Sequence, residues 1–139
     1  MKHRITLKEA TKFHGHLGPY LVLGLLAGEA ALKKLKCEKY FGLEVKVWGA
    51  NKKPQSCLVD GLQLSTGATY GKGNIMRLGG ERIKIECLNC NTRKKLIMTL
   101  KNNILAQLEN ARTHRDSEIL AKRLFKKSGS QPFNLRPNT

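Results

Sequence analysis

The chain of 139 residues contains few prolines, few aromatic residues and few acidic residues. Four prolines and thirteen glycines are too few for a disordered or fibrous chain, and 40% hydrophobic residues suffice for one core. The longest apolar stretch, residues 17–35, contains Glu29, Lys33 and Lys34, so we expect no transmembrane segment and no membrane contact. The N-terminus, MKHRITLKEA, lacks the apolar region of a secretory signal. We therefore expect one domain in the cytoplasm.

The scarcity of acidic residues makes the protein strongly basic. Twenty-six Lys and Arg against ten Asp and Glu give a formal net charge of +16. Anionic partners fit this charge, but no helix-turn-helix, zinc-finger or RNA-recognition signature accompanies it, so nucleic acid is not the favoured partner. The alternative function is a basic module whose C-terminal helix contacts nucleic acid or an acidic protein. Its contact residues would be Lys122, Arg123, Lys126 and Lys127.

The four cysteines are expected to be thiols, because disulfides are rare where no secretory signal is present. Cys87 and Cys90 form a CxxC motif, yet a second pair and a downstream histidine pair are both missing. Local spacing therefore assembles no structural zinc site. Cys37 follows a basic run at the end of an apolar segment, where packing is its expected role.

Two N-terminal helices are predicted. Thr6 and Glu9 form a capping box that begins a helix over residues 7–13. Pro19 begins a second helix that continues to about residue 36 and is apolar nearly all round, as in a buried helix. Gly24 and Gly28 would let another backbone approach closely, either in the core or in a dimer.

The rest of the chain is predicted to alternate between strands and helices. Ser56 is the expected N-cap of a helix over residues 57–65 that Gly67 ends. Strands are expected at residues 43–48, 75–78, 82–88 and 95–100, a helical pattern from 101 with a break at 113–116, and a frayed tail from Gly129. This order indicates an α+β single domain with a buried central helix, a small antiparallel sheet and a C-terminal helix. We divide the chain into a core, residues 1–110, and a basic C-terminal helix and tail, residues 111–139.

Two histidines and a cysteine are the main candidates for a site. His14 and His16 lie two residues apart in a loop, where both side chains can face one ion, although either could simply cap a helix end. Cys57 lies in the first turn of its helix, where the helix dipole should favour the thiolate. Asp60 follows on the same face and could orient a histidine, accept a proton or compensate the helix charge. Two histidines and one cysteine would leave an open metal position, as in catalytic zinc sites.

A glycine-rich loop, residues 70–74, is a candidate binding loop for an anion. Its backbone amides and Lys72 could approach a phosphate or carboxylate, and the expected cofactor contacts are Thr69, Gly71, Gly73 and Asn74. The P-loop spacing is absent, because Gly73 follows the lysine where Ser or Thr is required. A tight turn with a solvated lysine is the alternative interpretation.

Two blocks of sequence resemble the E-subunit family of formylmethanofuran dehydrogenase. They are FHGHLGPYLVLGLLAG at residues 13–28 and SCLVDGLQLSTGATYGKGNI at residues 56–75, and the resemblance extends over about residues 5–110. It implies an α+β core, a homodimer and a cleft that holds a divalent metal such as zinc. The positions that match the family's functional motif are His14, His16, Cys57, Asp60, Thr69, Lys72 and Asn74.

The chain departs from the family at Gly18 and Ala68, where many relatives carry cysteine, and it lacks their C-terminal zinc ribbon. A chain of 15.6 kDa without an iron–sulfur cysteine framework is not the catalytic subunit of a molybdenum or tungsten enzyme. We expect a metal-binding protein related or accessory to such enzyme systems, with a small anionic substrate or cofactor. If it is an enzyme, Cys57, Asp60 and Lys72 are its candidate catalytic residues. A purely structural protein is a further alternative.

Overall fold

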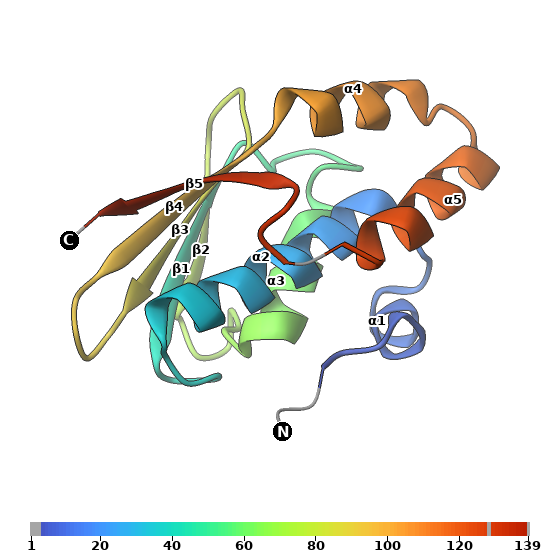
Figure 1. The fold of residues 1–139 in the computed structure, drawn as a ribbon. Coiled ribbons are helices and arrows are strands. Elements are labelled where there is room, and N and C mark those ends of the chain that lie inside the picture. The colour runs from blue at the N-terminus through green and yellow to red at the C-terminus, as the bar shows by residue number, and fades with distance from the viewer. Residues whose placement is uncertain (1–3, 128, 139) are drawn as a thin grey trace.

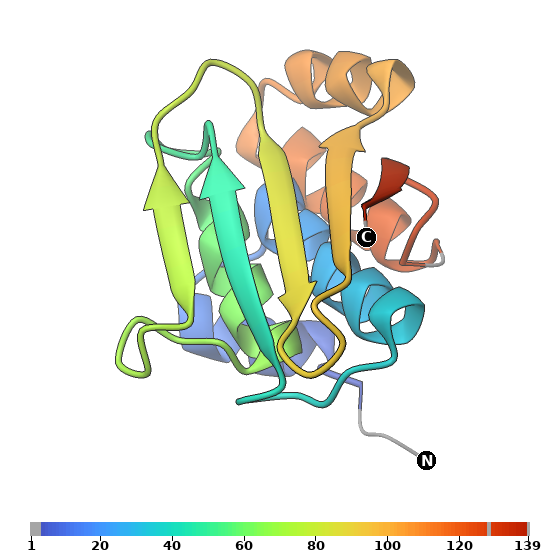
Figure 2. The same cartoon turned by 90° about the vertical axis from the view of Figure 1, so that its left-hand side faces the viewer.

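The computed structural model describes residues 4–127 and 129–138, which form a sheet with helices packed on one of its faces (Figure 1). The sheet has five strands in the order β2-β1-β3-β4-β5. In Figure 2 the other face of the sheet is turned to the viewer, and the helices lie behind it. The elements are α1 (Leu7–His14), α2 (Pro19–Leu35), β1 (Leu43–Trp48), α3 (Cys57–Thr66), β2 (Ile75–Leu78), β3 (Lys84–Asn89), β4 (Lys95–Leu100), α4 (Asn102–Asn110), α5 (His114–Phe125) and β5 (Phe133–Asn138).

The sheet is mixed, and the α+β fold class is confirmed. β1 pairs with β2 in parallel, while the β1–β3, β3–β4 and β4–β5 pairs are antiparallel. The expected sheet was antiparallel throughout. The difference arises at α3, which returns the chain across the sheet so that β2 runs in the direction of β1.

Helix α2 is the centre of the hydrophobic core, as its apolar sequence predicts. It is packed between α3, α5 and the sheet, and most of its side chains are buried. A Cβ at Gly24 would overlap the Leu58 carbonyl and lie 2.8 Å from the Gly61 Cα, so the two helices cross almost in backbone contact. A Cβ at Gly28 would likewise collide with Ser65. The close approach predicted at these glycines therefore occurs within one chain.

The C-terminal segment is part of the folded body, so the prediction of a frayed tail is wrong. Helix α5 begins at a cap in which Thr113 Oγ1 accepts from the Asp116 amide, and it packs against α2. Residues 133–138 then form the edge strand β5 beside β4. Gly129 and Pro132 suggested the frayed tail, but both precede the strand and do not interrupt it. Pro137 is tolerated within it because one side of an edge strand needs no hydrogen bonds.

Most other boundaries follow the sequence signals. The capping box of Thr6 and Glu9 is present at the start of α1, and Gly15 ends this helix in the left-handed conformation. Ser56 is the N-cap of α3, but among the described residues its side chain caps no amide. None of the helices in the described ranges is both long and apolar enough to cross a membrane.

Candidate functional site

The first feature of the site is a histidine held by a carboxylate. The end of α1 meets the first turns of α3, where His14 Nδ1 lies 2.6 Å from Asp60 Oδ2. His14 is largely buried, and its Nε2 is buried without a hydrogen-bond partner among the described residues. A carboxylate on Nδ1 fixes the tautomer with the proton on that nitrogen, which leaves the lone pair of Nε2 available.

The two predicted histidines lie together, and a third joins them. The rings of His14 and His16 are 4.9 Å apart, and the ring of His114 lies 6.2 Å from His16. Burial lowers the pKa of His16, and repulsion from the imidazoles of His14 and His114 lowers it further. The negative charge of Glu118 opposes this shift. His114 was missed in the sequence because it begins α5, far from the other two along the chain. Its position in a polar first turn of a helix does not indicate that its ring lies beside that of His16.

Cys57 lies half-buried in the first turn of α3, near Asp60. Burial is the largest cause that raises the pKa of its thiol, and the negative charge of Asp60 adds to it, while Lys53 lowers the pKa. The prediction of an easily ionised thiol is therefore wrong for the metal-free chain. The carboxylate that orients His14 also disfavours the thiolate.

A cavity of about 520 Å³ opens beside this helix face. Cys57, Asp60 and Gln63 line it from α3, at the spacing of one helical face, and His14 lines it from α1. Its remaining walls are Lys53, Ser56, Val59, Tyr70 and Arg77. Lys53 and Arg77 supply positive charge that no sequence motif had placed here. Arg77 pairs with the inward-facing Val47 across β1 and β2, so it too points to the helix side of the sheet.

The glycine-rich loop lies at the other end of α3. Lys72 Nζ donates to the carbonyl of Gly67, the C-cap of this helix, whereas Cys57 is its first residue. Ten residues separate these ends by about 15 Å. The structure therefore places His14, Cys57 and Asp60 around one cavity. His16 lies against His14 but outside the lining of that cavity, and Lys72 lies at the far end of α3.

The polar groups of this loop bond to one another and to the adjacent backbone. Asn74 Oδ1 accepts from the Thr69 amide at 2.9 Å, and Thr69 Oγ1 accepts from the amide of Lys72 at 3.1 Å. Gly71 and Gly73 form the exposed tip of the turn. The role of Thr69, Gly71, Lys72, Gly73 and Asn74 as contacts of a cofactor or substrate stays a prediction.

The other cysteines lie away from this site. All four cysteines, which fall within the described ranges, are free thiols. Cys87 is fully buried in β3, where burial raises the pKa of its thiol, and Cys90 follows in the hairpin turn. Among residues 4–127 and 129–138, no three His, Cys, Asp or Glu side chains are grouped so that they could hold a metal ion as they stand.

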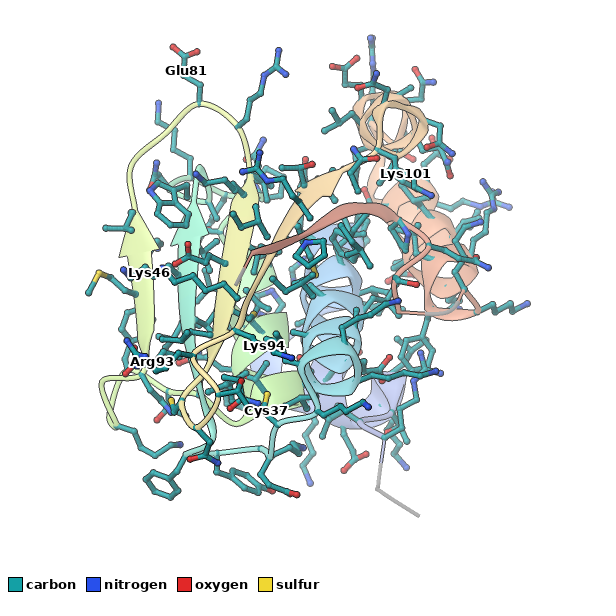
Figure 3. All side chains as sticks on the ribbon, turned by 60° about the vertical axis from the view of Figure 1, so that its left-hand side comes forward. Cys37, Lys46, Glu81, Arg93, Lys94 and Lys101 are labelled. Atoms are coloured by element: carbon teal, nitrogen blue, oxygen red, sulfur yellow. The ribbon has the colours of Figure 1, made fainter. Side chains whose placement is uncertain are left out.

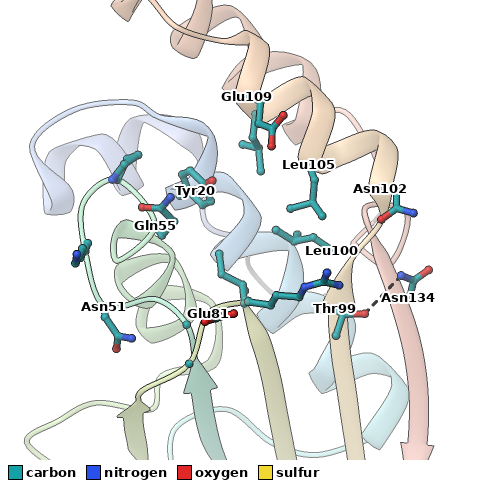
Figure 4. A pocket seen from close by; sticks show the side chains of 17 residues that line it. Tyr20, Asn51, Gln55, Glu81, Thr99, Leu100, Asn102, Leu105, Glu109 and Asn134 are labelled. Carbon is teal, nitrogen blue, oxygen red and sulfur yellow. Dashed lines mark hydrogen bonds between the residues drawn. The ribbon is translucent and has the colours of Figure 1, made fainter.

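A second, larger cavity of about 820 Å³ lies under α4, on the other side of the loop that precedes α3 (Figure 4). Leu105 and Leu108 of α4 face Tyr20 and the β2–β3 loop across it. Burial raises the pKa of Tyr20, and a hydrogen bond with Gln55 opposes this shift.

Comparisons with known proteins identify a family and a fold for this chain. A family model described as "FmdE, Molybdenum formylmethanofuran dehydrogenase operon" matches residues 13–131. A curated protein of Archaeoglobus fulgidus, named "Probable S-adenosyl-L-methionine-binding protein", is 33% identical over 76 residues, which are 52% of this chain. The chain spans only 20% of the length of that relative.

A solved structure shares the fold. It is the crystal structure of a tungsten formylmethanofuran dehydrogenase FmdE-like protein from Syntrophus aciditrophicus. The match has a TM-score of 0.67 and covers 96% of this chain and 70% of the other, at 22% sequence identity. At this identity the likeness shows the fold alone.

Proposed function

Because the chain belongs to the FmdE family, we propose that it is a cytoplasmic metal-binding protein whose site lies between α1 and the start of α3. The metal would be divalent, with zinc the best match for imidazole and thiol donors. His14 and His16 would hold it, with Cys57 as the third ligand after its side chain and that of His16 adjust. A position would then stay open for water or a substrate.

The observation that carries this proposal is the state of His14. A buried imidazole nitrogen without a partner is costly, and the described residues leave His14 Nε2 in that state. Its other nitrogen is held by Asp60 at 2.6 Å. A carboxylate behind a histidine is the usual support of a metal-binding imidazole, because it orients the ring and strengthens the donor.

The surroundings favour a small anionic substrate. Lys53 and Arg77 line the cavity and would attract a carboxylate or phosphate. A bound zinc ion would supply Lewis acidity and lower the pKa of a coordinated water. Asp60 would hold the proton on His14 Nδ1, and the Cys57 thiol would lose its proton when it becomes a ligand.

The names of the relatives support an accessory role beside a molybdenum or tungsten enzyme. We place the protein there as a homodimer, which light scattering of the purified chain would test. An activity of its own is a separate question from metal binding.

Zinc titration of the metal-free chain tests the site. We expect binding of about one zinc per chain, lost in His14→Ala and in Cys57→Ser. Asp60→Asn should bind zinc about 10- to 100-fold more weakly, because it loses the group that orients His14.

Matched controls separate this site from the other histidines and thiols. Cys90→Ser removes a thiol of similar exposure in the β3–β4 turn, and we expect zinc binding to stay unchanged. His114→Ala tests whether the third imidazole is a ligand. Failure of the wild type to bind zinc, or equal loss in Cys57→Ser and Cys90→Ser, would refute the proposed site.

A further inference from the structure

At the end of the molecule away from Cys57, exposed aromatic rings lie among basic side chains. Phe41 is 78% exposed and Tyr40 is 55% exposed, in the segment that joins α2 to β1. Such adjacent exposure is unusual for large apolar side chains in a chain whose aromatic content is only 6%. We call this surface the basic–aromatic tip; it comprises Lys36, Lys39, Tyr40, Phe41, Lys72, Arg93 and Lys94.

The backbone holds this segment in place. Tyr40 has a φ of 76°, a left-handed conformation that is rare for a bulky residue and is kept only where the surroundings impose it. Its amide donates to the Thr66 carbonyl at 2.8 Å, and its carbonyl accepts from Asn74 Nδ2 at 2.6 Å. The end of α3 and the glycine-rich loop thus fix the backbone that carries both rings.

Cations from two segments lie near the rings. Lys39 Nζ lies 5.4 Å from the centre of the Tyr40 ring, and Lys72 Nζ lies 5.3 Å from that of Phe41. The β3–β4 turn joins them, because the Cys90 amide donates to the Gly42 carbonyl at 3.0 Å.

The β3–β4 turn adds two more cations to this end. Figure 3 shows Arg93 and Lys94 near Cys37, at the end of the molecule opposite Glu81. Both side chains are exposed, as is Lys36 at the end of α2. Glu38 and Glu44 lie in the adjoining segments, but their two negative charges are outnumbered by the five cations of the tip. The tip therefore keeps an excess of positive charge.

We propose that the basic–aromatic tip binds single-stranded nucleic acid without sequence preference. Exposed rings provide stacking surfaces for bases, and neighbouring cations neutralise phosphates, which is the combination that single-strand binding requires. The cations alone would also suit an acidic protein, so the competition experiment below separates that partner from a nucleic acid. The fixed backbone of Tyr40 favours stacking further, since little conformational freedom is lost on binding. This function is independent of the metal site at the other end of α3.

Fluorescence anisotropy with a labelled oligouridine of about 16 nucleotides tests the rings. Phe41→Ala should weaken binding about tenfold or more, because one stacked base is lost, whereas Phe41→Trp should retain it. Phe13→Ala is the matched control, since Phe13 is 57% exposed on α1, outside the tip. The exposure of both side chains means that neither substitution should alter the fold, which circular dichroism would verify.

The salt dependence tests the cations. Lys36→Gln with Lys94→Gln should weaken binding and reduce the slope of log affinity against log salt by about 0.7 for each lost phosphate contact. The control pair, Lys122→Gln with Lys126→Gln, removes the same charge from α5 and should have little effect. Three results would overturn the proposal: no effect of Phe41→Ala, a loss confined to the α5 pair, or competition by polyglutamate equal to that by oligouridine, which would indicate an acidic protein partner.

Discussion

The two ends of helix α3 differ in how their polar groups are satisfied. At its start, His14 Nε2 is buried without a partner in the described part of the chain, and Asp60 holds the other ring nitrogen. At its end, Thr69 and Asn74 bond within their own loop and to the backbone of Tyr40. Both ends belong to one block of sequence, residues 56–75, that suggested a single site.

This difference separates a polar group that lacks a partner from polar groups that already stabilise a turn. An unsatisfied buried nitrogen costs stability unless a ligand completes it, so the start of α3 has a reason to bind a metal. The polar side chains of the loop after α3 gain no missing partner from a metal, because their hydrogen bonds already stabilise the turn and the segment before β1. Membership of a sequence motif is therefore a weaker guide to the role of a polar residue. Whether its hydrogen bonds are complete in the structure is a better one.

The largest expected effect comes from a substitution that displaces the whole of α3, and with it both of its ends. Gly24→Ala places a Cβ against the Leu58 carbonyl, so α2 and α3 must separate, at a cost of about 3 kcal/mol in the free energy of unfolding. Urea denaturation measures this loss. Gly79→Ala is the control, because a Cβ there has no neighbour within 4 Å among the described residues. Similar stability of the two variants would refute the close crossing.

Next in size is a change at the end of α3. Asn74→Ala leaves the Thr69 amide and the Tyr40 carbonyl without their partner, which should lower the free energy of unfolding by about 2 kcal/mol. Zinc affinity should stay unchanged. Asn91→Ala, in the exposed β3–β4 turn, is the control for both measurements. A loss of zinc binding in Asn74→Ala would join the two ends of α3 into one site.

A third prediction concerns a substitution that should increase zinc affinity at the start of α3 but not at its end. A Cβ at Gly18 would lie 3.4 Å from His16 Nε2, so Gly18→Cys adds a sulfur donor beside the proposed ligands. We expect about tenfold tighter zinc binding, equal to about 1.4 kcal/mol, in isothermal titration. Gly71→Cys adds the same thiol to the loop at the far end of α3 and should leave the affinity unchanged. Equal gains would mean that any added thiol recruits zinc.

The smallest expected effect concerns the reactivity of Cys57 in the metal-free chain. Burial and Asp60 raise the pKa of its thiol, so its alkylation rate should rise with pH with a midpoint above 9.0, the ordinary value. Asp60→Asn removes the repulsion and should speed alkylation severalfold at pH 8. Mass spectrometry distinguishes Cys57 from Cys90, whose rate should not change. An unaltered rate at Cys57 would show that Asp60 does not act on this thiol.

Much of the fold is visible in local sequence signals. The capping box of Thr6 and Glu9, the proline at the start of α2 and the alternation of β1 each act within a few residues, and the structure confirms all three. The parallel pairing of β1 with β2 depends on how α3 packs, which no local pattern records. Strand β5 was missed because Gly129 and Pro132 suggested a frayed tail, whereas its pairing with β4 depends on long-range packing.

The candidate site divides in the same way. His14, Cys57 and Asp60 were predicted from spacing at helix ends, and all three line one cavity. His16, predicted with them, lies against His14 but does not line that cavity. His114 and Arg77 reach the neighbourhood of the site through α5 and β2, so their positions depend on long-range packing. Lys72 was assigned to the site because it follows α3 closely in sequence, although the length of that helix separates it from Cys57.

The packing of α5 on α2 and of β5 on β4 has a consequence for synthesis. While the chain leaves the ribosome, α2 exposes the apolar face that α5 will cover, and β4 exposes the edge that β5 will pair with. Such surfaces associate with other chains, so a fragment that stops at Asn110 should aggregate and depend on chaperones. Helix α5 and strand β5 thus cover surfaces that the preceding elements leave exposed.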